Sequence, residues 1–205
     1  MPASLAHEIA SLTGEHIVLV AVALLTASLL GIPAGVFLTR KEAWRSAVLG
    51  FTNVVQTIPS LALFGFLIPL PFVGGIGKRT AIVALVLYAL LPILRNTLTG
   101  ILGVDAAVVE SATAMGMTDR QRLFRVELPL AAPTILAGVR VAAVTTIGTA
   151  TIAAAIGGGG LGVFIFRGLA SVDSSQILAG AVPAALLALA ADGGLGWIER
   201  RFARR

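Results

Sequence analysis

The residue types that could do chemistry gather in one polar stretch of an otherwise apolar chain. ESATAMGMTDRQRLFRVELP, residues 110–129, carries three arginines, one aspartate and two glutamates, with Gly116 in its first half and a proline at its end. Alanines and the glycine leave room for another surface to approach closely. With its helix-favouring lead-in, the stretch defines a segment, residues 105–129, that is called the polar loop below. Its composition predicts a contact surface.

The polar loop is expected to fold as two short amphipathic helices that meet at the central glycine. Asp105 is a suitable N-cap for the first helix. Thr118 and Gln121 form a capping box that starts the second. Pro129 is expected to end that second helix, because the residue before a proline disfavours the helical region.

Two glycine-rich segments resemble nucleotide-binding motifs but lack the context that such motifs need. GGGGLG (157–162) follows a long apolar run, whereas a dinucleotide fingerprint must join a strand to a helix. It is read as a chain reversal with close backbone approach. GIGKRT (75–80) resembles the end of a Walker A loop, but Phe72 replaces a glycine and Arg79 stands where Ser or Thr must hold Mg²⁺. The chain is therefore expected to bind no nucleotide or other cofactor itself.

Membrane enzymes need histidines, serines or carboxylates clustered within the helix bundle. The two histidines, His7 and His16, lie near the N-terminus, the apolar runs hold a single carboxylate, Asp192, and cysteine is absent. These facts argue against an intramembrane protease, a lipid phosphatase or a metal site. The chain is expected to be non-catalytic.

Composition places the chain in a membrane. Of its 205 residues 57% are hydrophobic and 12% charged, and the mean hydropathy is +0.97. Soluble domains carry about 25% charged residues, so this chain cannot cover a water-soluble globule. The net charge of +5 comes from short basic clusters between long apolar runs, which is typical of membrane topology and argues against a nucleic-acid partner.

Five apolar runs are long enough, or nearly so, to cross a bilayer as helices, which takes about 20 residues. The predicted fold is all-α, one polytopic membrane domain over residues 1–205, with no signal peptide in residues 1–14. The expected spans are 16–38, 48–70, 80–94, 130–156 and 176–198.

The distribution of Lys and Arg predicts the orientation of these spans. One side of the membrane receives eleven: Arg40, Lys41, Arg45, Arg95, Arg120, Arg122, Arg125, Arg200, Arg201, Arg204 and Arg205. The other receives three: Lys78, Arg79 and Arg167. Because basic residues favour the cytoplasmic side, we expect the N-terminus outside, and the polar loop and the C-terminus in the cytoplasm.

Polar residues within the spans are candidates for a translocation path. They are Asn53, Gln56, Thr57, Pro59, Tyr88, Arg140, Thr145 and Thr149. Polar groups at membrane depth normally face the bundle or a watery cavity, and for Asn53, Gln56, Thr57 and Pro59 hydrogen bonds between helices are an equal alternative. The threonine hydroxyls could also bond back to their own helix. For Arg140, an ion pair with Asp192 is favoured over contact with a substrate carboxylate.

The register of the polar loop resembles a known motif. Glu110, Ala112, Gly116, Val126 and the pair Leu128-Pro129 are spaced as in the EAA loop of binding-protein-dependent ABC importer permeases, with Ser111 and Val126 as mild departures. VVQTIPSLALFGFLIPL (54–70), IGGGGLGVFIFRGL (156–169) and SSQILAGAVPAALLALAADGGLGWIERR (174–201) resemble the permeases of glycine betaine, carnitine and choline importers.

The resemblance implies a type I ABC importer permease core in a bacterial inner membrane. In that family the loop forms coupling helices that dock into a cytoplasmic ATPase dimer, which holds the ATP and Mg²⁺. Glu110, Ser111, Ala112, Gly116, Leu128 and Pro129 would shape this contact, and we add Arg120, Arg122 and Arg125 as charged contacts. An extracytoplasmic substrate-binding protein, a second permease subunit and membrane lipid are the other expected partners.

Two alternatives remain at this point. The permease could carry another small solute such as an amino acid, since amino-acid importers share the same loop. An ATP-independent carrier or channel is the other, but neither inverted repeats nor several intramembrane ionisable residues are apparent. Aromatic residues are few, two Trp, one Tyr and nine Phe, so a tight cage for a quaternary ammonium is expected on a separate binding protein.

Overall fold

The computed structural model describes residues 2–71 and 73–203, with side chains from residue 5 onward, and this part of the chain is helical and contains no strand. Four helices are long: α1 (Pro2–Arg40), α4 (Lys78–Leu102), α7 (Leu128–Ile152) and α9 (Ser174–Ala203). The shorter ones are α2 (Glu42–Thr57), α3 (Ser60–Leu67), α5 (Ala106–Ala114), α6 (Asp119–Arg122), the π-turn η1 (Leu123–Glu127), the 3₁₀ turn η2 (Ala153–Ile156) and α8 (Gly162–Ser171).

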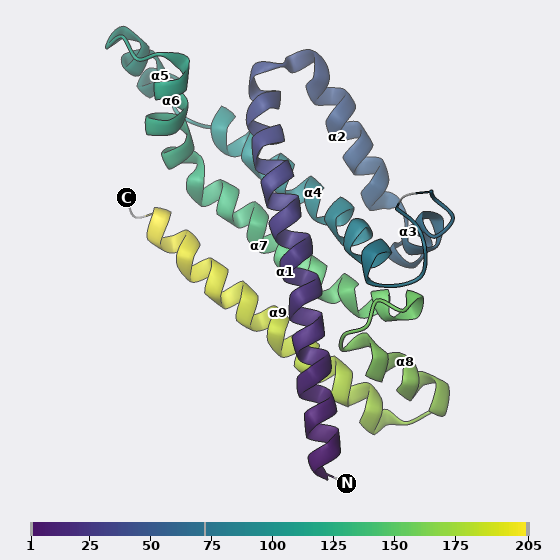
Figure 1. Ribbon diagram of the computed structural model, residues 1–205. Coiled ribbons are helices and arrows are strands. Elements are labelled where there is room, and N and C mark those ends of the chain that lie inside the picture. The colour runs from purple at the N-terminus through teal and green to yellow at the C-terminus, as the bar shows by residue number, and fades with distance from the viewer. Residues whose placement is uncertain (1, 72, 204–205) are drawn as a thin grey trace.

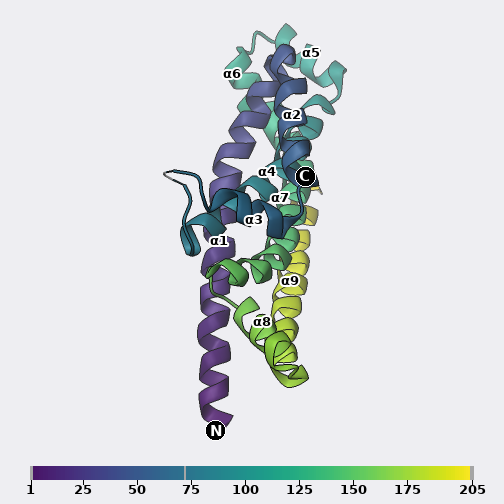
Figure 2. The ribbon, with the colours of Figure 1, turned by 90° about the vertical axis from the view of Figure 1, so that its right-hand side faces the viewer.

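The helices divide the molecule into two ends and a middle. α5 and α6 form one end, together with the turn between α1 and α2, while the N-terminus and α8 form the other (Figures 1 and 2). The long helices run between these ends. The polar loop is thus separated from the glycine-rich reversal by the length of the bundle, as expected for segments on opposite sides of a membrane.

Four long helices are apolar enough to span a bilayer, and α2 with α3 makes a fifth candidate that is bent by 104°. The all-α prediction is confirmed, and the chain over the second predicted span, residues 48–70, is bent. Ile58 is extended, with ψ of 127°, and Pro59, which has no N–H to donate, stands as the cap of α3. The chain therefore turns sharply at this dipeptide, and α3 ends at Leu67.

Two other predicted boundaries differ from the structure. The span predicted over 80–94 is a helix of 25 residues, Lys78–Leu102, because Arg95 and Asn96 continue it with side-chain bonds to Asn53 and to the Pro92 carbonyl. The first span begins well before residue 16, since α1 starts at Pro2. Apolar content alone underestimates these helices, whose ends carry polar residues.

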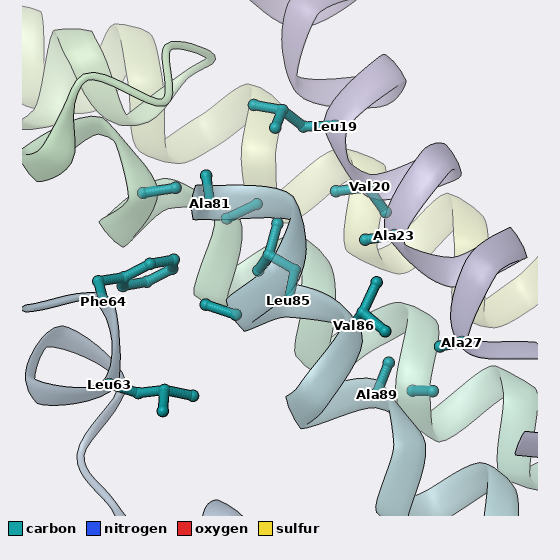
Figure 3. Close-up of a cluster of buried hydrophobic side chains, with 14 of the residues drawn as sticks. Leu19, Val20, Ala23, Ala27, Leu63, Phe64, Ala81, Leu85, Val86 and Ala89 are labelled. Carbon is teal, nitrogen blue, oxygen red and sulfur yellow. The ribbon is translucent and has the colours of Figure 1, made fainter. Parts of the chain in front are cut away.

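α4 is the centre of the bundle. Figure 3 shows Leu19, Val20, Ala23 and Ala27 of α1 and Leu63 and Phe64 of α3 around Ala81, Leu85, Val86 and Ala89 of α4. In its most apolar stretch 50% of α4 is buried within the chain, against 11% for α9. α9 therefore leaves most of its surface for lipid or for another subunit.

Glycines let α1 and α7 approach α4 closely. A Cβ added at Gly35 of α1 would lie 2.7 Å from Cβ of Thr97, and one added at Gly138 of α7 would lie 2.8 Å from the carbonyl oxygen of Pro92. Real Cβ atoms do not come so near, so both positions need a residue without a side chain. Close backbone approach of this kind is how membrane helices gain packing energy.

The glycine-rich reversal follows η2. Gly157, Gly159 and Gly160 have φ of 74°, 81° and 76°, a region that side chains disfavour. The backbone N–H of Gly160 lies 3.3 Å from Oε2 of Glu15, and Glu15 pairs with Lys78 at 3.2 Å. The predicted close backbone approach is confirmed, and the segment is held against α1 and the start of α4.

Two glycines of the same helix provide a test of this packing. Gly138→Ala should lower the free energy of unfolding of the detergent-solubilised chain by about 1–3 kcal/mol, because the added methyl overpacks the α4 contact. Gly148→Ala is the matched control: nothing lies within 4 Å of its Cβ position, so the better helix propensity of alanine should raise stability by up to about 1 kcal/mol. Equal effects of the two substitutions on denaturant unfolding would contradict the packing described.

Candidate functional site

The first helix of the polar loop is capped as its sequence predicts. The carboxylate of Asp105 accepts a hydrogen bond from the Ala107 N–H at 2.9 Å. Ser111 and Thr113 donate to carbonyl oxygens one turn earlier, at 2.7 and 2.9 Å, so their hydroxyls are used within the helix. Ala112 is buried. α5 is therefore a self-contained helix whose outward face is free for contacts.

Gly116 ends this helix in a Schellman motif. The Met117 N–H donates to the Ala112 carbonyl at 3.2 Å and the Gly116 N–H donates to the Thr113 carbonyl at 2.9 Å, the two bonds that define the motif. Gly116 has φ of +82°, and no atom lies within 4 Å of where its Cβ would be. The glycine is required by its backbone conformation, and the space beside it is open to a partner.

The second helix starts as predicted but does not end as predicted. Thr118 and Gln121 form the capping box, with bonds of 2.9 and 3.3 Å. Pro129 does not end the helix: α6, η1 and α7 follow one another without a break, and Pro129 lies in the first turn of α7. The wide turn at residues 123–127 precedes Pro129. Proline lacks a backbone N–H, but the N–H groups in the first turn of a helix make no hydrogen bond within that helix. The polar loop thus continues into the fourth span without a non-helical residue between them.

A buried carboxylate, Glu127, joins three parts of the chain. Its side chain is 3% exposed and pairs with Arg40, the last residue of α1, and with Arg122 at 3.0 Å. Arg122 also contacts Asp119 at 3.0 Å and the Thr113 hydroxyl at 3.2 Å. Arg122 was predicted as a charged contact for a partner, but its side chain is only 15% exposed, because the buried carboxylate draws it inward. Its contact with a partner stays a prediction.

The other charged residues of the polar loop point outward. Glu110, Arg120 and Arg125 are exposed, and no ion pair is recorded for them in the described part of the chain. Arg120 and Arg125 line an open hollow of about 490 Å³ with Thr118, Gln121 and Phe124. Both signs of charge are therefore available on this end of the molecule for contacts with a partner.

Large apolar side chains accompany these charges. Val108, Met115 and Phe124 are 42%, 72% and 59% exposed. Leu128, by contrast, packs beside the buried residues Ile101, Ala131 and Ile135, while Pro129 is exposed. An exposed apolar surface between charged groups is typical of a protein-binding face.

The described residues offer no group of His, Cys, Asp or Glu that could hold a metal ion.

The polar residues predicted to line a path fall into two separate groups. The first surrounds the break between α2 and α3. Asn53 accepts from Arg95 at 2.8 Å, Gln56 donates to the Tyr88 carbonyl at 2.9 Å, and the Tyr88 hydroxyl donates to the Ile58 carbonyl. These bonds fasten the broken span to α4, which favours the structural alternative for them.

Thr57 and Pro59 also belong to the first group. The second group, Thr145, Thr149 and Arg140, lies on α7. Thr57 is exposed and bonds back to the Val54 carbonyl at 2.7 Å. Thr145 and Thr149 likewise bond to carbonyls of α7 at 2.9 Å.

Arg140, the remaining member, pairs with two carboxylates of α9. It contacts both oxygens of Asp192, at 2.6 and 2.8 Å, and Glu199 at 3.3 Å. The predicted Arg140–Asp192 pair is confirmed. A role of these residues in a path stays a prediction.

Sequence reasoning missed Glu127, Arg40 and Glu199 as partners in these clusters. A carboxylate directly before Leu128-Pro129, at the start of an apolar run, was the available signal for Glu127. The identity of its partner was not readable, because Arg40 lies 87 positions away. α8, a helix of ten residues between two spans, was also missed.

Comparison with known proteins places this geometry in context. The chain is 48% identical over 189 residues to the glycine betaine/carnitine/choline transport system permease protein OpuCB of Bacillus subtilis, covering 92% of this chain and 86% of that protein. It is 44% identical over 195 residues to the osmoprotectant import permease protein OsmW of Salmonella typhimurium, covering 94% and 89%. The resemblance to osmoprotectant permeases is thereby confirmed.

A solved structure and a family description agree with these relatives. A chain of the methionine ABC transporter MetNI in an inward-facing conformation has a TM-score of 0.83 and 25% identity, covering 93% of this chain and 94% of that one. The fold is that of a type I ABC importer permease. The family described as binding-protein-dependent transport system inner membrane component matches residues 27–204. This protein is therefore a multi-pass transport permease and belongs to the binding-protein-dependent transport system inner membrane component family.

Proposed function

We propose that this permease is the membrane-spanning subunit of an ATP-driven importer that passes a quaternary-ammonium osmoprotectant, such as glycine betaine, carnitine or choline, into the cytoplasm. One observation supports the coupling role. The polar loop exposes Glu110 and the open turn at Gly116, called the glycine corner below, and its second helix continues through η1 into the span α7. The substrate class is supported by the relatives, which are named as permeases for these compounds at 43–48% identity.

The polar loop would act as a mechanical joint. An ATPase dimer that closes on ATP and Mg²⁺ would push on α5 and α6, outside the membrane. Because α6 runs through η1 into α7, a push on α6 moves α7 without a hinge between them. A rigid-body rearrangement of this kind is a known route between two states of a protein. This chain supplies the lever, and the partner supplies the hydrolysis.

The other proposed partners are inferred from the few aromatic residues of this chain and from the exposed surface of α9. A quaternary ammonium is held tightly by an aromatic cage, but Trp44 and Trp197 are exposed near helix ends, and Arg201 stacks on Trp197 at 4.6 Å. Substrate recognition is therefore assigned to a separate binding protein outside the cell. A second permease subunit would cover the free surface of α9. The excess of basic residues on the side of the polar loop supports an outer N-terminus and a cytoplasmic C-terminus.

The ATPase contact is tested by co-purification. Glu110→Lys should weaken recovery of the ATPase of the same transporter with the tagged permease, because it reverses an exposed charge at the proposed contact. Glu42→Lys is the control: it reverses another exposed carboxylate, whose side chain is 90% exposed and lies 3.9 Å from Arg45. Undiminished recovery with Glu110→Lys would remove Glu110 from the contact. Wild-type permease that recovers no ATPase would overturn the importer role.

The glycine corner is tested by two substitutions at one position. Gly116→Trp should leave membrane insertion intact and abolish uptake, since a bulky group would fill the space beside the corner. Gly116→Asn separates bulk from backbone strain, because asparagine tolerates positive φ better than other residues with side chains, and it should retain much of the uptake. Full uptake by Gly116→Trp would show that no partner approaches this corner.

The substrate class is tested by uptake into cells that lack their own osmoprotectant importers. Cells expressing the complete transporter should accumulate radiolabelled glycine betaine, carnitine or choline, and an excess of unlabelled osmoprotectant should suppress the accumulation. A methionine competitor should not. Accumulation of methionine in place of these compounds would contradict the proposed substrate and retain the ATP-driven mechanism.

A further inference from the structure

A buried ion cluster ties the polar loop to a helix that does not adjoin it in sequence. We propose that Glu127 and Arg40 are positioning residues that fasten α1 to the polar loop, so that α1 moves with the loop when the ATPase pushes on it. The inference rests on the proposed coupling function and adds α1, which the loop does not join covalently, to the helices that the loop would move.

The burial of Glu127 shows that its partners are needed. Its side chain is 3% exposed, and both of its carboxylate oxygens are engaged: Oε1 by Nε of Arg122 at 3.0 Å and Oε2 by Arg40. A buried charge that loses its partner is strongly unfavourable, whereas a paired one is tolerated. The arrangement therefore resists separation of α1 from the loop more than an exposed ion pair would.

The π-turn makes this pairing possible. Arg122 and Glu127 are five positions apart, and on a regular α-helix such residues point about 140° away from each other. Residues three or four apart are the ones that normally meet. η1, at residues 123–127, is a wider turn with its Leu128 N–H bonded to the Leu123 carbonyl, which brings the two side chains to one side. π-turns of this kind are frequent at functional sites.

Arg122 extends the cluster to the first coupling helix. Besides Glu127 it contacts the Thr113 hydroxyl of α5 at 3.2 Å and Asp119 of α6 at 3.0 Å. A continuous set of polar contacts thus runs from α5 through Arg122 and Glu127 to Arg40 at the end of α1. α1 in turn packs along α4 and contacts α7, so its displacement reaches the middle of the bundle.

Arg40 is the position at which the proposal can be tested without unfolding the loop. Its side chain is 42% exposed, and its removal leaves Glu127 paired with Arg122. Arg40→Gln should leave ATPase recovery and the yield of folded permease unchanged, and should lower the uptake of glycine betaine per ATP hydrolysed in proteoliposomes by about fivefold. Arg40→Lys, which keeps a cation, should restore much of the ratio.

Lys41→Gln is the matched control. It removes the same charge from the adjacent exposed position, for which no ion pair is recorded in the described part of the chain, and it should transport as the wild type does. A merely structural role for Arg40 would lower the yield of complex and reduce hydrolysis and uptake together, without changing their ratio; that result overturns the proposal. So does wild-type coupling in Arg40→Gln.

A distance measurement tests the same idea without a substrate. The chain has no cysteine, so cysteines introduced at Phe37 of α1 and Ala106 of α5, both exposed, accept spin labels specifically. In the wild-type complex the distance between them should stay constant between nucleotide-free and ATP-trapped states, and it should change in Arg40→Gln. A distance that changes in the wild type overturns the fastening of α1. A wild type that recovers no ATPase overturns the proposed function and this inference together.

Discussion

Close approach to α4 is the constraint on which the bundle depends. In lipid, apolar side chains gain little by facing one another, because the surrounding hydrocarbon is equally apolar, so helices associate through tight packing of small residues. Here Gly35 of α1 and Gly138 of α7 meet α4 at distances that leave no room for a Cβ, and alanines fill the interface (Figure 3). The proposed lever of α1 and α7 would act on α4 through these close contacts.

Ion pairs lie at three levels along the bundle. Arg40 and Glu127 meet where α1 ends beside the polar loop, Glu15 and Lys78 meet near the glycine reversal, and Arg140 lies between them with two carboxylates of α9. Each of these ion pairs joins two different elements of the fold. The ion pairs therefore join particular helices, while the glycines and alanines set how closely the helices pack. This division keeps uncompensated charge out of the hydrocarbon, where it is costly.

Local features of the fold could be predicted from the sequence, and long-range ones could not. The Asp105 cap and the Thr118–Gln121 capping box depend on residues at most three positions apart, and both are present. The continuation of the helix through Pro129 was missed because a proline is harmless when the preceding turn is wide, and the width of a turn leaves no simple mark in a sequence. The pairing of Arg122 with Glu127 was missed for a related reason: the two residues lie at a spacing that pairs only on a π-turn. The Arg140–Asp192 pair was predictable because both charges stand out in apolar runs at similar depth.

The two connections of the polar loop to the bundle differ in stiffness, and this difference bears on how force would travel. On one side α6 continues through η1 into α7 without an interruption. On the other, α4 ends at Leu102, and a short turn leads to the Asp105 cap. A push on α5 and α6 is therefore delivered to α7 directly, whereas α4 can lag behind it. The contact from Glu127 to Arg40 joins α1 to the continuous connection between α6 and α7. Relative movement would then develop between α4 and the pair α1–α7, across the same small-residue interfaces that hold the bundle together. Sliding packed helices past one another by small shifts is an established form of domain motion.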